Sequence, residues 1–184
     1  MPDRPPYPDI PSCAISRKES DLLADLTTGG RVLEIGSWLG YSTVWMALNG
    51  AVVVAVDPHE WQDTGSAFRV NLRRYGVRDR VTPVYLTSQA FAADPGPGGA
   101  APFDAAFIDG DHSYEVARHD LLLARRLVKP GGWIIAHDYA YPGYNFGGCP
   151  EVVRAVDEVL GDLREVRREH WVYAARLAAA RTEG

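Results

Sequence analysis

The chain has 184 residues, of which 46% are hydrophobic and 23% charged, with a formal net charge of −5. One domain with a sizeable core is expected at this length, and the acidic balance implies no basic face for nucleic acid. No apolar run approaches the roughly 20 residues of a membrane span, and the cysteines Cys13 and Cys149 form no C-x-x-C pair, which is typical of a cytoplasmic protein.

The chain begins with the proline-rich stretch MPDRPPYPDIP, which lacks the apolar centre of an export signal. We expect residues 1–18 to be an irregular arm, either folded over a ligand pocket or without order, and residues 19–184 to form the domain. A helix is predicted over 19–28, because Gly29 and Gly30 are a natural helix stop.

Short runs of apolar or β-branched residues predict strands near 31–35, 52–56, 81–85, 104–108 and 132–136. Apolar residues recur at helical spacing between these runs, as at Phe68, Leu72 and Tyr75. Such alternation predicts an α/β fold: a doubly wound, mainly parallel sheet with helices on both faces. Residues 163–168 and 171–177 are expected to close the sheet as an antiparallel pair, with a helical alanine-rich tail as the alternative.

The stretch VLEIGSWLGYST, from Val32 to Thr43, is typical of a buried strand that ends in an acid and a glycine turn before a helix. A second apolar run, AVVVAV, ends in Asp57. Acids at two strand ends indicate a nucleotide-type pocket, in which Asp57 is placed to bind both ribose hydroxyls. The turn lacks the middle glycine of the dinucleotide fingerprint, and Glu34 would repel a pyrophosphate, which favours a cationic ligand.

This turn resembles motif I of the class I S-adenosylmethionine-dependent methyltransferases. The resemblance continues through VVVAVDPHE, FDAAFIDGDHSYE and LVKPGGWIIAHDY, over roughly residues 30 to 140. The resemblance is strongest to the metal-dependent small-molecule O-methyltransferases of macrolide-sugar and catechol type, which have an IDGDHSY segment.

The resemblance implies a Rossmann-like methyltransferase fold that transfers a methyl group from S-adenosylmethionine to a hydroxyl of a small molecule, in natural-product tailoring. The cofactor-binding residues that it implies, together with the acids above, are Glu34, Gly36, Ser37, Tyr41, Ser42, Asp57, Ser88 and Asp109. For Ser88 an N-cap role is an equally good interpretation.

Asp109 and Asp138 follow two strands that should be neighbours, and paired carboxylates suit a hard ion such as Mg²⁺. In metal-dependent relatives these acids are ligands, and the third ligand lies beside the second acid, where this chain has His137 and Tyr139. Imidazole is a softer ligand, so Mn²⁺ is also expected, and a site without metal remains open. The alternative is that both acids only cap the following helices.

His112 is the predicted general base, because imidazole titrates near the working pH and relatives use the corresponding histidine in this role. The alternative is a surface or capping histidine. The aromatic and glycine-rich segment 139–149 is the candidate acceptor lid.

Two other classes of function remain as alternatives: a nicotinamide-dependent oxidoreductase, and a protein of this fold that binds the cofactor without catalysis. The missing middle glycine argues against the first, and the intact set of Asp109, His112 and Asp138 against the second. The expected partner is a small-molecule acceptor, with no nucleic acid and no membrane. A homo-oligomer that completes the site is expected from fold-level analogy alone.

Overall fold

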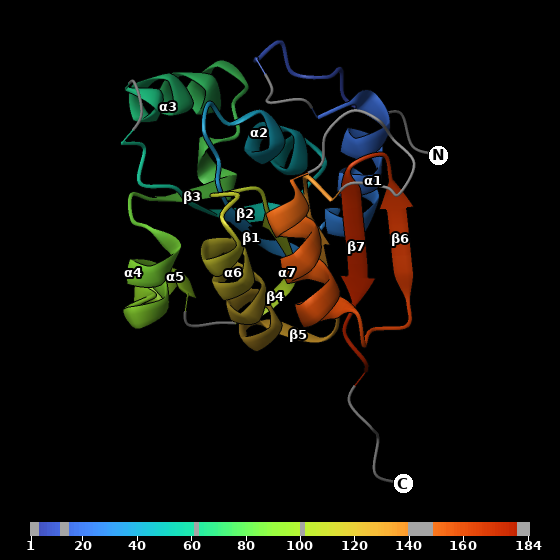
Figure 1. Ribbon diagram of the computed structural model, residues 1–184. Helices are drawn as coiled ribbons and strands as arrows, with labels where there is room; N and C mark the ends of the chain where they lie inside the picture. The colour runs from blue at the N-terminus through green and yellow to red at the C-terminus, as the bar shows by residue number, and fades with distance from the viewer. Residues whose placement is uncertain (1–3, 12–14, 61–62, 100–101, 140–148, 180–184) are drawn as a thin grey trace, which may run out of the picture.

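A seven-stranded sheet with helices on both faces forms the centre of this computed structural model, which describes residues 4–11, 15–60, 63–99, 102–139 and 149–179 (Figure 1). The strands are β1 (Arg31–Ile35), β2 (Val52–Val56), β3 (Val81–Val84), β4 (Phe103–Ile108), β5 (Val128–Ala136), β6 (Val166–Glu169) and β7 (Val172–Arg176). The helices are α1 (Arg17–Thr27), α2 (Tyr41–Leu48), α3 (Thr64–Arg74), the 3₁₀ turn η1 (Arg78–Arg80), α4 (Ser88–Ala93), α5 (Gly96–Gly99), α6 (Tyr114–Leu127) and α7 (Pro150–Leu160).

The strand order is β3-β2-β1-β4-β5-β7-β6. The first five of these are parallel, whereas β7 pairs antiparallel with β5 and β6 antiparallel with β7. The predicted doubly wound, mainly parallel sheet with an antiparallel carboxyl-terminal part is therefore confirmed. Residues 172–176 of the tail form strand β7, so the helical alternative is wrong for them.

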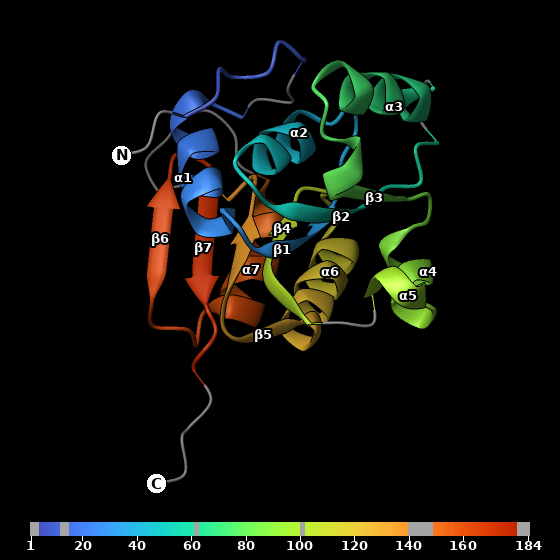
Figure 2. The same ribbon diagram turned by 180° about the vertical axis from the view of Figure 1, so that it is seen from behind.

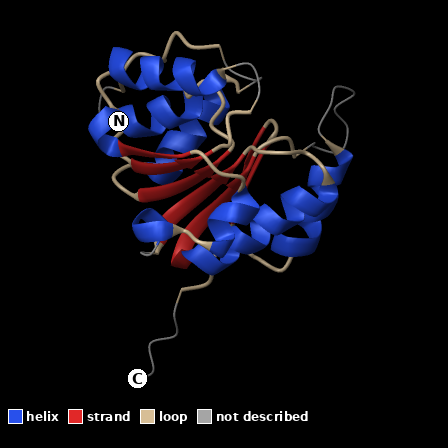
Figure 3. Ribbon diagram, turned by 90° about the vertical axis from the view of Figure 1, so that its left-hand side faces the viewer, coloured by secondary structure: helices blue, strands red, loops and turns tan. Residues whose placement is uncertain are grey.

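Strand residues alternate between two cores, which explains why helices are needed on both faces. Val32 packs with α1, α2 and α3, while its neighbour Leu33 packs with α4, α6 and α7. Figure 3 shows these two helix layers on opposite sides of the sheet. Both faces of the parallel strands are covered, as the apolar runs in the sequence predict.

Helix α1 begins two residues earlier than predicted, at Arg17, because Ser16 is its N-cap. Ser16 and Glu19 form a reciprocal capping box, and Gly29, with a φ of +71°, follows the end of the helix. The described part of the arm lies beside α1 and α2 (Figure 2). There Tyr7 stacks on Trp45, with ring centroids 4.6 Å apart, and Ile10 is buried in the core.

Candidate functional site

The carboxyl ends of β1, β2, β4 and β5 bring the predicted motifs to one edge of the sheet. Two cavities open there, and both are lined by the glycine turn after β1 and by Asp109 after β4. The β2-side cavity has a volume of about 580 Å³ and extends past Asp57 to the start of α4. The β5-side cavity has a volume of about 180 Å³ and extends to His112 and Asp138.

The glycine turn can lie against β4 only because Gly36 has no side chain. Its φ is +86°, and an added Cβ would lie 2.1 Å from the carbonyl oxygen of Asp109. This close approach makes the turn and the end of β4 a shared wall of both cavities.

Asp57 holds the glycine turn from the neighbouring strand. Its Oδ2 accepts hydrogen bonds from the amides of Ser37 (2.9 Å) and Trp38 (2.8 Å), and its Oδ1 accepts one from the amide of His59 (2.7 Å). A carboxylate offers about four acceptor sites, so about one remains for a ligand hydroxyl in the β2-side cavity.

Glu34 lies beneath the turn and lines neither cavity, because its side chain points into helix α2. Its Oε1 accepts from the Ser42 hydroxyl at 2.5 Å, and its Oε2 accepts from the Thr43 hydroxyl. Burial raises the pKa of Glu34 to about 8, although the two hydroxyls oppose this shift. Any effect of Glu34 on a ligand passes through Ser42, which lines the β5-side cavity together with Ser37 and Tyr41.

The capping interpretation of Ser88 is wrong. The N-cap of α4 is Thr87, whose hydroxyl accepts from the amide of Ala90 at 3.2 Å. Ser88 is instead the first residue of the helix, is buried, and lines the β2-side cavity with Gln89.

The predicted acids and histidines after β4 and β5 form one contact cluster. His137 Nδ1 lies 3.3 Å from Asp109 Oδ1 and 3.2 Å from Asp138 Oδ2. His112 Nε2, from the segment between β4 and α6, lies 2.9 Å from the same Asp138 oxygen. Asp138 has a φ of +58°, a left-handed conformation that aspartate tolerates better than most residues.

The cluster shifts the pKa of each of its members. Burial lowers the pKa of His137, but hydrogen bonds to Asp109 and Asp138 outweigh it and raise the pKa to about 10. The hydrogen bond to Asp138 raises the pKa of His112 above its usual value. Burial raises the pKa of Asp109, and for Asp138 the bonds to His112 and His137 outweigh burial and hold its pKa well below the usual range.

The same cluster offers a donor set for a divalent ion. One ligand atom from each of Asp109, His137 and Asp138 lies within 4.8 Å of the others. Two carboxylates with one imidazole fit Mn²⁺ or Mg²⁺, provided that His137 Nδ1 is unprotonated when it ligates. The three predicted ligands are thus brought together. The catechol-type pattern has Asn at the position of Tyr139, and here the Tyr139 hydroxyl donates to Asp157 at 2.8 Å.

Two buried acids beside the site were not predicted from the sequence. Asp120 on α6 is buried and lines the β2-side cavity. Its signal was its position on the apolar stripe of the helix, between Ala117 and Leu121. Glu19 on α1 is buried with its Oε1 3.9 Å from His137 Nε2, and its signal was the Ser16-x-x-Glu19 capping pattern.

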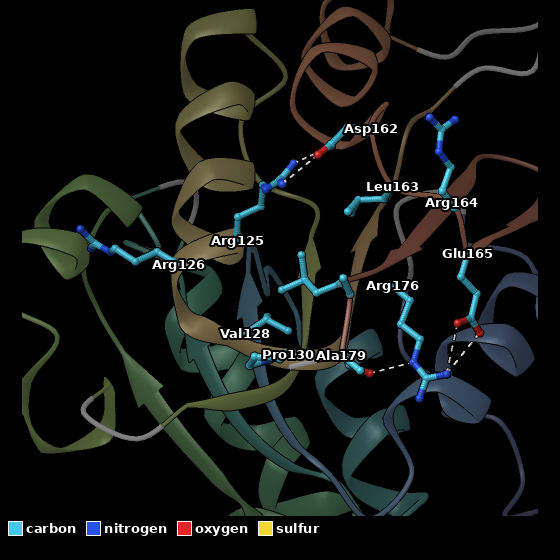
Figure 4. A pocket seen from close by; sticks show the side chains of 13 residues that line it. Arg125, Arg126, Val128, Pro130, Asp162, Leu163, Arg164, Glu165, Arg176 and Ala179 are labelled. Atoms are coloured by element: carbon cyan, nitrogen blue, oxygen red, sulfur yellow. Dashed lines mark hydrogen bonds and ion pairs between the residues drawn. The ribbon is translucent and has the colours of Figure 1, made fainter. Parts of the chain in front are cut away.

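The segment 139–149, expected to be an acceptor lid, lies outside the described residues except for its two ends. A separate groove of about 820 Å³ lies at the opposite edge of the sheet, by the start of β5 (Figure 4). Its Arg125 pairs with Asp162 and its Arg176 with Glu165, and it contains none of the predicted site residues. None of the helices in the described ranges is long and apolar enough to cross a membrane.

Comparison with known proteins gives matches over most of the chain. Residues 33–139 match the family model described as a methyltransferase domain. A catechol O-methyltransferase of Mycobacterium tuberculosis is 37% identical over 131 residues, which are 69% of this chain and 57% of that protein. The chain therefore spans less than two thirds of the length of this curated relative.

Solved structures resemble the whole described fold. Cofactor-bound Rv0187 from MTB has a TM-score of 0.71 and 26% identity, and the match covers 94% of this chain and 85% of that one. The O-methyltransferase from Bacillus cereus in complex with SAH has a TM-score of 0.69 and 23% identity, over 90% of this chain and 84% of that one. At this identity the second likeness concerns the fold alone.

Proposed function

This chain belongs to the methyltransferase domain family that its residues 33–139 match, and on that premise we propose that it transfers a methyl group from S-adenosylmethionine to a hydroxyl of a small molecule. The observation that carries the proposal is the meeting of two cavities at the carboxyl edge of the sheet. One is suited to a nucleoside, and the other holds a histidine–carboxylate pair.

In this proposal the nucleoside occupies the β2-side cavity. Asp57 accepts a ribose hydroxyl, and the base lies near Ser88 and Gln89. The methionine part extends past Gly36 into the β5-side cavity, toward Ser37, Tyr41 and Ser42, with Asp109 between the two cavities. The match to the methyltransferase domain family and the likeness to Rv0187, which was solved with its cofactor bound, support a bound cofactor at this edge of the sheet.

His112 is the proposed base. Its Nε2–H donates to Asp138, so Nδ1 is left to take the proton of the acceptor hydroxyl. The acceptor oxygen forms a bond to the methyl carbon as the carbon–sulfur bond breaks, and the sulfonium leaves as the neutral thioether of S-adenosylhomocysteine. The Asp138 carboxylate stabilises the imidazolium that results.

Asp109, Asp138 and His137 are the proposed ligands of a divalent ion. When bound, such an ion supplies a Lewis acid that lowers the pKa of an acceptor hydroxyl. The name of the Mycobacterium tuberculosis relative, a catechol O-methyltransferase, supports an acceptor with a phenol-type hydroxyl. We also propose a cytoplasmic location, a homo-oligomer and a role in natural-product tailoring. The division into an arm over residues 1–18 and a domain over residues 19–184 is likewise a proposal.

Neither alternative gains support. A nicotinamide-dependent oxidoreductase is not favoured by the family match or by the relatives named above. A binding protein without catalysis is not favoured by the contact between His112 and Asp138.

The proposal is tested by calorimetric titration of the protein with S-adenosylhomocysteine, and by formation of that product from S-adenosylmethionine with catechol as the acceptor. We expect Asp57→Ala to weaken binding by roughly 1–3 kcal/mol, the effect of losing a charged hydrogen bond. Asp104→Ala is the matched control, because Asp104 also accepts a backbone amide (Arg31, 2.7 Å) but lines neither cavity. Unchanged affinity in the Asp57 variant would reject the placement, and no binding by the unaltered protein would reject the function.

A further inference from the structure

A buried carboxylate without a hydrogen-bond donor lies in the wall of the β2-side cavity. Asp120 is 1% exposed, and neither of its oxygens has a hydrogen-bond partner among the described residues. It lies on the buried face of α6, in line with Ala117, Leu121 and Ala124, where an apolar side chain would suffice for packing.

The residues around Asp120 leave at least one of its oxygens without a donor. The Ser88 hydroxyl interacts with the carboxyl, but it has a single proton, and Gln89 Oε1 at 3.3 Å competes for it. Gly110 approaches from the end of β4, where an added Cβ would lie 3.5 Å from Asp120 Oδ2, and it has no side chain to donate. Burial raises the pKa of Asp120 to about 6, with Ser88 and His119 opposing the shift.

An unpaired buried acceptor is costly, and such groups in folded proteins are normally paired with a donor. The donor for Asp120 is therefore expected from what occupies the cavity. Asp57 and Asp120 both line this cavity, and Asp57 is the proposed ribose contact. The base of the nucleoside then falls near Ser88, Gln89 and Asp120. In adenine the exocyclic donor is the 6-amino group.

We propose that Asp120 is an adenine-recognition residue, whose carboxylate accepts a hydrogen bond from the 6-amino group of the cofactor. This inference rests on the proposed function and adds a specificity to it. Asp120 selects a 6-aminopurine and rejects a 6-oxopurine, because the oxo group would place a second acceptor against the buried carboxylate.

The test compares two ligands in the same protein by calorimetric titration: S-adenosylhomocysteine and its 6-oxo analogue, S-inosylhomocysteine. We expect the unaltered protein to prefer the adenine compound by roughly 10–100-fold, the range for a hydrogen bond to a charged group. Asp120→Ala should bring the ratio of the two affinities near one. Asp120→Asn keeps the shape and should also abolish the preference, because its amide can donate to the oxo group. The exposed Asp79 gives the charge-matched control, and Asp79→Asn should retain the full preference.

The ratio separates recognition from structural damage. If Asp120 only supports packing, its variants will weaken both ligands equally and keep the ratio, which overturns the inference while the proposed function stands. An unaltered protein without preference between the two ligands overturns it as well. If the unaltered protein binds neither compound, the proposed function fails together with it.

Discussion

At the scale of single residues, one oxygen of Asp138 contacts two imidazole rings. Its Oδ2 lies 2.9 Å from His112 Nε2 and 3.2 Å from His137 Nδ1. The two rings differ in access, since the side chain of His112 is 52% exposed and that of His137 only 1%. A small-molecule hydroxyl can therefore reach His112 directly, whereas His137 is suited to hold the carboxylates in place.

Replacing His112 tests this difference. We expect His112→Ala to lower turnover by about 10²–10⁴-fold, the usual effect of losing a general base, with nearly unchanged affinity for S-adenosylhomocysteine. His119→Ala is the control, because His119 lies on α6 and lines neither cavity. Near-normal turnover of the His112 variant across pH 6 to 9 would show that it is not the base, and His137→Ala would then be the next variant to measure.

The sequence predicts the positions of these residues well where they follow a strand. Asp57, Asp109 and Asp138 each come after an apolar run, so their place at the carboxyl edge of the sheet follows from the fold class. Glu34 is different, because it lies inside β1 and its side chain points into α2. For Asp120 the stripe of apolar residues on α6 indicates burial, but its place in the cavity wall depends on how α6 packs beside the distant start of α4.

At the scale of elements, the junction of β1 and α2 depends on a buried glutamate. Two hydroxyls of the first turn of α2, from Ser42 and Thr43, donate to Glu34. The helix thus contacts the strand through a group whose pKa, at about 8, lies above its ordinary value of 4.5. A carboxyl with a raised pKa in the folded state favours folding most when it is protonated.

This shift predicts a pH dependence of stability. The contribution of Glu34 is complete below pH 4.5, the ordinary value, and is lost as the pH rises toward 8. In this window we expect the Tm of the ligand-free protein to fall by roughly 2–4 °C per pH unit more than that of Glu34→Gln, because unfolding of the unaltered protein releases the proton of Glu34. If the Tm values of the unaltered protein and of Glu34→Gln change equally with pH between pH 5 and 8, Glu34 is not a buried, protonated carboxyl. Glu115→Gln, at an exposed position on α6, controls for the loss of a carboxyl.

At the scale of the whole molecule, the proposed ion would join two central strands. Asp109 follows β4, whereas His137 and Asp138 follow β5, and these strands pair in parallel. A ligand that binds only the folded state raises its stability by mass action. Binding of the ion should therefore be visible in thermal unfolding as well as in turnover.

Metal removal tests the ion by both measurements. Exhaustive chelation should abolish turnover, and Mg²⁺ or Mn²⁺ should restore it and raise the Tm in a concentration-dependent way. Asp138→Asn should lose the rise in Tm. Full turnover after chelation would reject the metal and leave methyl transfer by His112 intact.

The fold class of the sheet could be predicted from the sequence, but the order of its strands could not. The parallel strands and the closing antiparallel pair follow from the pattern of apolar runs. That β7 lies between β5 and β6 does not, because strand order depends on pairing between distant segments. The contact of Glu19 with the amide of Trp171, at 2.8 Å, is of the same kind, since the two residues are 152 positions apart.

That last contact has a consequence for biosynthesis. A chain emerges from the ribosome amino end first, and its early segments begin to fold while later ones are still being made. Helix α1 and the parallel strands can pack together in that order. One side of His137 stays uncovered, however, until β7 has paired with β5 and Trp171 has bound Glu19. The β2-side cavity, the proposed nucleoside site, can thus form during translation, whereas the proposed proton-transfer cluster around His137 is completed only with the carboxyl-terminal hairpin.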